Sequence, residues 1–120
     1  MFLTSLDSSQ YHPTNQTYNF TVELPQTLEG AFTCALLEFF SQSLNNEELY
    51  VYCDICESSL TRDRMLPLIR IVPEVGEVNI PYFLKITRPI VQRIRIYIRD
   101  RDYKIPDYDI GPIRCTLGFV

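Results

Sequence analysis

Four cysteines are the residues whose spacing most directly suggests chemistry: Cys34, Cys53, Cys56 and Cys115. Cys53 and Cys56 form a C-x-x-C pair, a spacing used both by zinc knuckles and by redox proteins. A structural zinc site needs four ligands, usually supplied by two such turns, but the sequence has no second C-x-x-C and only one histidine. Residues 50–56 have the pattern of a strand, on which side chains three positions apart point to opposite faces unless a bulge intervenes. We therefore expect no metal ion and buried free thiols, as is usual in a reducing compartment.

Histidine and paired carboxylates are the other candidates for catalysis or metal binding. His12 lies beside a proline without a Gly-x-Ser-x-Gly elbow or matching nucleophile, so we interpret it as a loop residue. Asp100 and Asp102 are spaced to share one face of an extended segment, and Asp107 and Asp109 repeat that spacing. The glycine and the further ligands of a calcium loop are missing, so we expect exposed turn carboxylates. With four glycines and no phosphate-binding loop, the sequence predicts no enzyme, no cofactor and no small-molecule substrate.

An arginine-rich strand is the better functional candidate. Residues 91–99 alternate apolar and polar side chains, so one face carries Arg93, Arg95, Tyr97 and Arg99, with about 7 Å between alternate residues. Arginine is suited to bidentate contacts with carboxylates, and the chain has nine arginines against two lysines. We predict that these four side chains contact an acidic protein partner. The alternative is a solvated outer face paired with Glu and Asp of adjacent strands. Further amphipathic anchors are the tyrosines Tyr50, Tyr52, Tyr97, Tyr103 and Tyr108.

Charge is divided unevenly along the chain. The first 60 residues carry eight acidic side chains and no Lys or Arg, whereas the last 60 carry all 11 basic and seven acidic side chains. Two interpretations are open: neutralisation between strands paired within one molecule, or a bipolar surface that docks on copies of itself or on a complementary protein. The isoelectric point near 4.9 argues against nucleic acid as a partner.

Hydropathy argues against a membrane-bound or secreted protein. No stretch approaches the roughly 20 apolar residues of a membrane helix. The first ten residues lack the basic and apolar regions of a secretory signal. We expect a protein that is made in the reducing interior of the cell, is not secreted and does not contact a membrane.

Composition and periodicity predict an all-β chain. Val, Ile, Thr, Tyr and Phe make up over a third of the 120 residues, and alanine occurs twice, a composition that favours strands. The length suits one domain spanning residues 1–120. Apolar runs bounded by proline, glycine or polar residues predict strands at 20–24, 31–40, 49–55, 66–72, 82–87, 91–99 and 113–120, with a weaker one at 2–6. Their spacing indicates a single β-sandwich or jelly roll of seven to eight antiparallel strands.

Several short motifs together carry a resemblance to a known family. In chain order they are Leu6-Asp-Ser-Ser9, His12-Pro-Thr-Asn15, Phe20-Thr-Val-Glu-Leu-Pro25, Cys34-Ala-Leu-Leu-Glu38, Ile94-Arg-Ile-Tyr-Ile98 and Cys115-Thr-Leu-Gly-Phe119. The series resembles short β-rich proteins of adenovirus-like and Polinton-like double-stranded DNA viruses, which are penton-like or minor capsid proteins with jelly-roll domains. The resemblance implies a virion component that forms a homo-oligomer, such as a pentamer, and contacts other capsid proteins.

We therefore expect a viral structural protein, a small jelly-roll capsid component that acts through self-assembly. Closed rings would satisfy its heterologous contacts. The alternative is a non-structural viral β-sandwich module that binds a host or viral protein, for example by adding a strand at a sheet edge.

Overall fold

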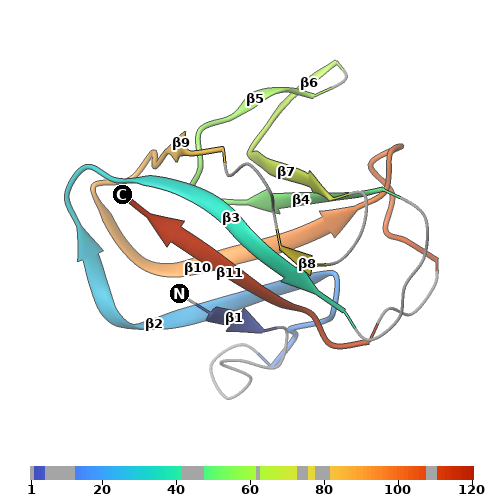
Figure 1. The fold of residues 1–120 in the computed structure, drawn as a ribbon, viewed down its shortest axis with the longest axis horizontal. Coiled ribbons are helices and arrows are strands. Elements are labelled where there is room, and N and C mark those ends of the chain that lie inside the picture. Colours follow the sequence, from blue (N-terminus) through green and yellow to red (C-terminus); the bar gives the residue numbers. More distant parts are fainter. Residues whose placement is uncertain are drawn as a thin grey trace.

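The computed structural model of the chain is built from antiparallel strands (Figure 1). It describes residues 2–4, 13–41, 48–61, 63–72, 76–77, 82–107 and 111–120. Within these residues there are eleven strands and no helix, so the all-β prediction is confirmed. No helix of this part is long and apolar enough to cross a membrane.

The first sheet is centred on two long strands that pair with each other. Its order is β1-β11-β3-β8, and β9 also pairs with β3. The strand bounds are β1 Phe2–Thr4, β3 Thr33–Phe40, β8 Gly76–Glu77, β9 Leu84–Lys85 and β11 Arg114–Phe119. In this sheet β3 is a central strand, as the apolar run at 31–40 predicts.

The second sheet has the order β2-β10-β4-β7. Its strands are β2 Asn19–Glu29, β4 Leu49–Cys53, β7 Leu68–Val72 and β10 Ile90–Arg99. A separate two-stranded hairpin of β5 (Ser59–Thr61) and β6 (Arg64–Leu66) projects beyond the two sheets between β4 and β7 (Figure 1).

Both sheets contribute to one hydrophobic core, which makes the architecture sandwich-like. From the second sheet, Ile94, Ile96 and Ile98 of β10 are fully buried, as their alternation in the sequence predicts. From the first sheet, Leu36 and Leu117 are buried in the same cluster. Burying a side chain of this size stabilises the fold by about 1.5–3 kcal/mol, so the inward faces of the long strands hold the two sheets together.

The strand predicted at 20–24 is longer in the structure, where β2 continues through Pro25 to Glu29. Glu23 pairs with Arg93 and Leu28 pairs with Val91, so the residues between Glu23 and Leu28 bulge out opposite Gln92. Proline is tolerated in bulges and on edge strands because no ladder hydrogen bond is lost there, and β2 is an edge strand. The expectation that Pro25 ends the strand was therefore wrong.

The regions 58–64 and 82–87 also differ from expectation. The first lies between the strands predicted at 49–55 and 66–72, yet it contains β5 and the start of β6. The second, predicted as a strand, forms only the two-residue β9. Its backbone also forms hydrogen bonds with the turn that follows β4 of the second sheet: Glu57 N donates to Lys85 O at 2.8 Å, and Thr87 N donates to Ile55 O at 2.8 Å. This segment thus ties β3 of the first sheet to the turn that follows β4.

The core role of β10 predicts a contrast between two isoleucines of the same strand. Ile96 is fully buried, whereas Ile90 is 54% exposed. We expect Ile96→Ala to lower the free energy of unfolding in urea by about 2–5 kcal/mol and Ile90→Ala to lower it by about 0.5 kcal/mol or less. Equal losses for the two variants would contradict this packing.

Candidate protein-interaction face

The arginines predicted to contact a partner lie on the outer side of the second sheet. Arg93 Nε donates to Glu23 Oε1 at 2.9 Å, and Arg95 Nε donates to Asn19 Oδ1 at 2.9 Å. Both acceptors belong to the neighbouring strand β2. The bond to Glu23 is the kind of pairing with an adjacent carboxylate that the alternative predicts, whereas Asn19 is uncharged. Each bond uses one of the five N–H donors of a guanidinium, so both exposed side chains keep donors on their outer side.

Tyr97 is in the same row but lies beneath its neighbours, with 7% of its surface exposed. It pairs in register with Tyr52 of β4, and the two rings stack at 4.8 Å and 10°. Guanidinium groups cover the Tyr97 ring at 4.7 Å for Arg95 and 5.2 Å for Arg99. Such cation–π contacts stabilise by about 0.5–2 kcal/mol each. Tyr97 therefore holds Arg95 and Arg99 in place and offers little surface of its own.

The half-buried Arg99 is also held by backbone carbonyls. Its Nη1 donates to Ile98 O at 2.8 Å and to Tyr18 O at 3.5 Å. Of the predicted row, Arg93 and Arg95 are thus the accessible members; Arg95 lies over the buried Tyr97 ring, and Arg93 is held by Glu23.

Tyr103 closes this cluster from a tight loop. Its φ of 60° is in the left-handed region, which non-glycine residues seldom adopt. The loop is stabilised by Asp100, whose Oδ1 accepts the amides of Asp102 at 2.8 Å and Lys104 at 2.9 Å. The Tyr103 ring meets Tyr52 edge to face at 5.5 Å. Asp100, considered above as a calcium ligand, is therefore a turn-forming carboxylate of the Asx type.

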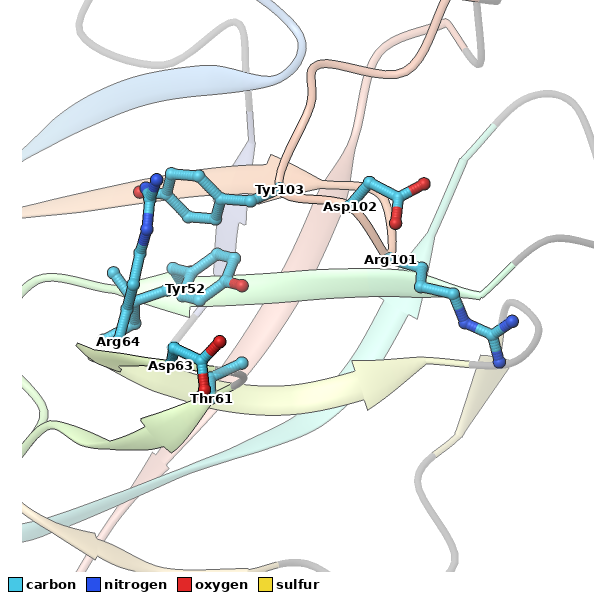
Figure 2. A pocket seen from close by; sticks show the side chains of 8 residues that line it. Tyr52, Thr61, Asp63, Arg64, Arg101, Asp102 and Tyr103 are labelled. Carbon is cyan, nitrogen blue, oxygen red and sulfur yellow. The ribbon is translucent and has the colours of Figure 1, made fainter.

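A small pocket opens between this loop and the β5–β6 hairpin (Figure 2). Its volume is about 190 Å³, and its lining residues are Tyr52, Thr61, Asp63, Arg64, Leu66, Arg101, Asp102 and Tyr103. Arg64 stands over the Tyr103 ring at 5.2 Å, while the Arg101 guanidinium extends away from the tyrosines (Figure 2). Sites for drug-sized ligands measure about 300–1,000 Å³, so this pocket suits one inserted side chain. We call the outer side of β10 together with this pocket the Arg–Tyr face.

Sequence reasoning identified four members of the Arg–Tyr face on β10 and named Tyr52 and Tyr103 as anchors, but it missed Arg64, Asp63 and Thr61. These three lie in or beside the β5–β6 hairpin, which the polar residues of that region concealed. Leu60 and Met65, which flank the hairpin turn and pair with each other, are the signal that could have revealed it. Tyr108 lies outside the described residues.

Ion pairs link the acidic and basic halves of the chain. Arg93 contacts Glu23 at 2.9 Å and Arg88 contacts Asp54 at 3.3 Å. In both, an acid of the first 60 residues meets an arginine of the last 60, and these exposed pairs contribute at most about 1 kcal/mol each. Neutralisation within one molecule thus accounts for part of the charge division.

The expectation for Cys53 and Cys56 was partly wrong. β4 ends at Cys53, and Cys56 N donates to Cys53 O at 3.1 Å, so residues 53–56 form a turn and not a continuing strand. Asp54 favours the turn because its carboxylate accepts Arg95 N at 2.9 Å. The turn brings the thiols of Cys53 and Cys56 together with Cys34 of β3 in mutual hydrogen bonds.

All four cysteines, Cys115 included, are buried free thiols, as predicted. Hydrogen bonds from Cys34 and Cys53 lower the pKa of Cys56 to about 4, against the effect of burial. Hydrogen bonds with Cys34 and Cys56, and to a smaller extent burial, raise the pKa of Cys53 well above its usual value. For Cys34 the hydrogen bond with Cys53 lowers the pKa, but the bond to Cys56 and burial outweigh it and raise the pKa overall.

The remaining candidates for metal binding are His12, Asp107 and Asp109. Asp107 is exposed, and His12 and Asp109 lie outside the described residues. Within the described part of the chain, no group of three or more His, Cys, Asp and Glu side chains is placed to hold a metal ion.

Comparison with known proteins found no matching family model, no matching curated protein and no matching solved structure.

The burial of Tyr97 predicts a loss of stability at alkaline pH. Burial, and to a smaller extent a hydrogen bond with Tyr103, raises the pKa of Tyr97 above its usual value near 10. The contribution of Tyr97 to the free energy of unfolding is present below pH 10. It is lost as the pH rises further, because the Tyr97 hydroxyl ionises in the unfolded chain at a lower pH than in the folded chain. The raised pKa values of Cys34 and Cys53 also lower the stability above pH 9. The test therefore compares the pH dependence of the wild type with that of a variant that lacks only the Tyr97 hydroxyl.

We expect the unfolding free energy of wild type to fall more steeply between pH 10 and 11 than that of Tyr97→Phe. Urea unfolding at each pH measures this difference. Tyr82→Phe, at a ring that is 64% exposed, serves as the control and should keep the wild-type slope. A Tyr97→Phe variant with the wild-type slope would contradict the assignment.

The buried thiols predict protection from modification. We expect the native protein to resist a water-soluble thiol reagent and to expose four reactive thiols per chain in urea. Val120→Cys places a thiol at a position that is 76% exposed and should add one fast-reacting group in the native state. Rapid modification of Cys56 in the native wild type would contradict its burial.

Proposed function

We propose that the sandwich is a jelly roll. The observation that carries this proposal is the nesting of strand pairs: β1 pairs with β11, β2 with β10, β3 with β8 and β9, and β4 with β7. In this nested arrangement the first strand pairs with the last and each later pair lies inside the one before it, as in a single long hairpin. Successive pairs alternate between the two sheets, so the hairpin winds into the eight-position order typical of a jelly roll. The β5–β6 hairpin is then an insertion between the fourth and fifth positions.

We further propose that the chain is a small viral capsid component, penton-like or minor, that acts by assembly with copies of itself and with other capsid proteins. Jelly rolls occur in viral capsids, lectins and cupins, so the fold alone does not decide among these functions. The viral context rests on the motif resemblance, which also implies a virion location and synthesis in the reducing interior of the host cell.

The Arg–Tyr face supports contact with protein over contact with a small molecule. Interfaces are enriched in arginine and tyrosine, and here Arg93 and Arg95 are both exposed, with Arg95 lying over the stacked Tyr97 ring. Rigid aromatic support lowers the entropy lost when an arginine is fixed in a complex. The pocket beside them is of side-chain size. An acidic segment of a neighbouring subunit matches both features.

Charge reversal on this face tests the proposal. We expect the double variant Arg93→Glu with Arg95→Glu to shift wild-type oligomers toward monomer, measured by light scattering at two protein and two salt concentrations. Salt should loosen the wild-type assembly as well, because it screens exposed charges. Arg114→Glu on the first sheet serves as the charge-change control and should leave the assembly intact.

Two outcomes would contradict the proposal. If neither the double variant nor added salt changes the oligomers, the Arg–Tyr face takes no part in assembly. A strict monomer under every condition would favour the alternative, a non-structural viral module that binds a host or viral protein.

A further inference from the structure

The β5–β6 hairpin carries an exposed apolar pair on one of its faces. Leu60 and Met65 lie directly opposite each other in register and are 76% and 64% exposed. Their neighbours Thr61 and Arg64 line the Arg–Tyr pocket. Because alternate side chains of a strand point to opposite faces, the Leu60–Met65 pair faces away from that pocket. This pair leaves apolar surface on a projecting element, which a contact with another molecule would remove from water.

An open groove lies at the base of the same hairpin. It has a volume of about 590 Å³ and runs along β7, the edge strand of the second sheet, with residues 57–59, Tyr82 and Leu84 forming its other walls. Ile71 and Tyr82 offer apolar surface in it, being 37% and 64% exposed. The groove and the Leu60–Met65 pair are thus neighbouring apolar surfaces, since Ser59 both lines the groove and begins β5.

Opposite charges also line the groove. Glu57 and Arg70 are both on its walls, and neither takes part in an ion pair with the described residues. Glu57 Oε1 accepts a bond from Lys85 N at 3.3 Å. Arg70 is half-buried, and the described part of the chain gives its guanidinium no hydrogen-bond partner. A half-buried arginine in this position is expected to meet a carboxylate in a complex, because burying a charge without a partner is costly.

We propose that this surface binds a second copy of the chain, with the Leu60–Met65 pair of each copy inserted into the groove of the other. A two-fold axis near Ser59 satisfies both insertions at once, because hairpin and groove adjoin on one molecule, and such isologous contacts are self-complementary. The same axis brings Glu57 of one copy toward Arg70 of the other, twice. The inference rests on the proposed self-assembly and specifies a second contact, at a groove whose lining shares no residue with the Arg–Tyr pocket.

A charge swap tests this contact. The single variants Glu57→Arg and Arg70→Glu are each expected to weaken the dimer about tenfold or more, because each places like charges together. The double variant has the pairs reversed and should recover an affinity within a few-fold of wild type. Sedimentation equilibrium of the full chain over a wide concentration range measures all four proteins, and circular dichroism checks that each is folded.

A second variant tests the apolar part. Leu60→Asp should abolish the dimer, while Thr87→Asp, an exposed position outside the groove lining, should leave it intact. Single variants with the wild-type affinity, or a double variant that fails to recover, would overturn the contact.

The outcomes separate this inference from the proposed function. Wild-type oligomers that ignore Glu57, Arg70 and Leu60 but dissociate on reversal of Arg93 and Arg95 would overturn the hairpin contact alone. A wild-type chain that stays monomeric at every concentration would overturn both proposals. The groove would then be available to bind a strand of another protein.

Discussion

The pairing of β10 with β2 on one side and β4 on the other is the interaction on which the rest of the structure depends. In this register Ile94, Ile96 and Ile98 face the core, while Arg93 and Arg95 face outward. A slip of one residue would exchange the two faces of the strand and bury the arginines. The same register places Tyr97 opposite Tyr52, so the core and the Arg–Tyr face are fixed by one set of backbone hydrogen bonds.

The sequence predicts well those elements whose pattern is local. The alternation of residues 93–96 is repeated in the burial of β10, although Tyr97 of the outer row is buried too, and the apolar run at 31–40 becomes the central strand β3. It predicts poorly what depends on distant partners. The turn after Cys53 forms because the Asp54 carboxylate binds the amide of Arg95, a residue far along the chain. Pro25 remains in a strand because a bulge on the sheet edge accommodates it.

The candidate site shows the same division. The four side chains on β10 could be identified from periodicity, but Arg64 and Tyr103 join them only through the projecting hairpin and the loop held by Asp100. In our proposal the hairpin takes part in two contacts, one at the Arg–Tyr pocket and one at the groove along β7. Under this proposal, two distinct contact surfaces would let one subunit join more than one neighbour. The stacked rings of Tyr52 and Tyr97 support the Arg–Tyr face, whereas the groove is built on the edge strand β7.

Self-assembly is the central claim, and native mass spectrometry of the wild-type chain tests it most directly. The account predicts discrete species at integer multiples of the 14.1 kDa subunit, with even-numbered species populated through the two-fold contact and all of them declining as ionic strength rises. A single 14.1 kDa species across the accessible concentration range would contradict the claim.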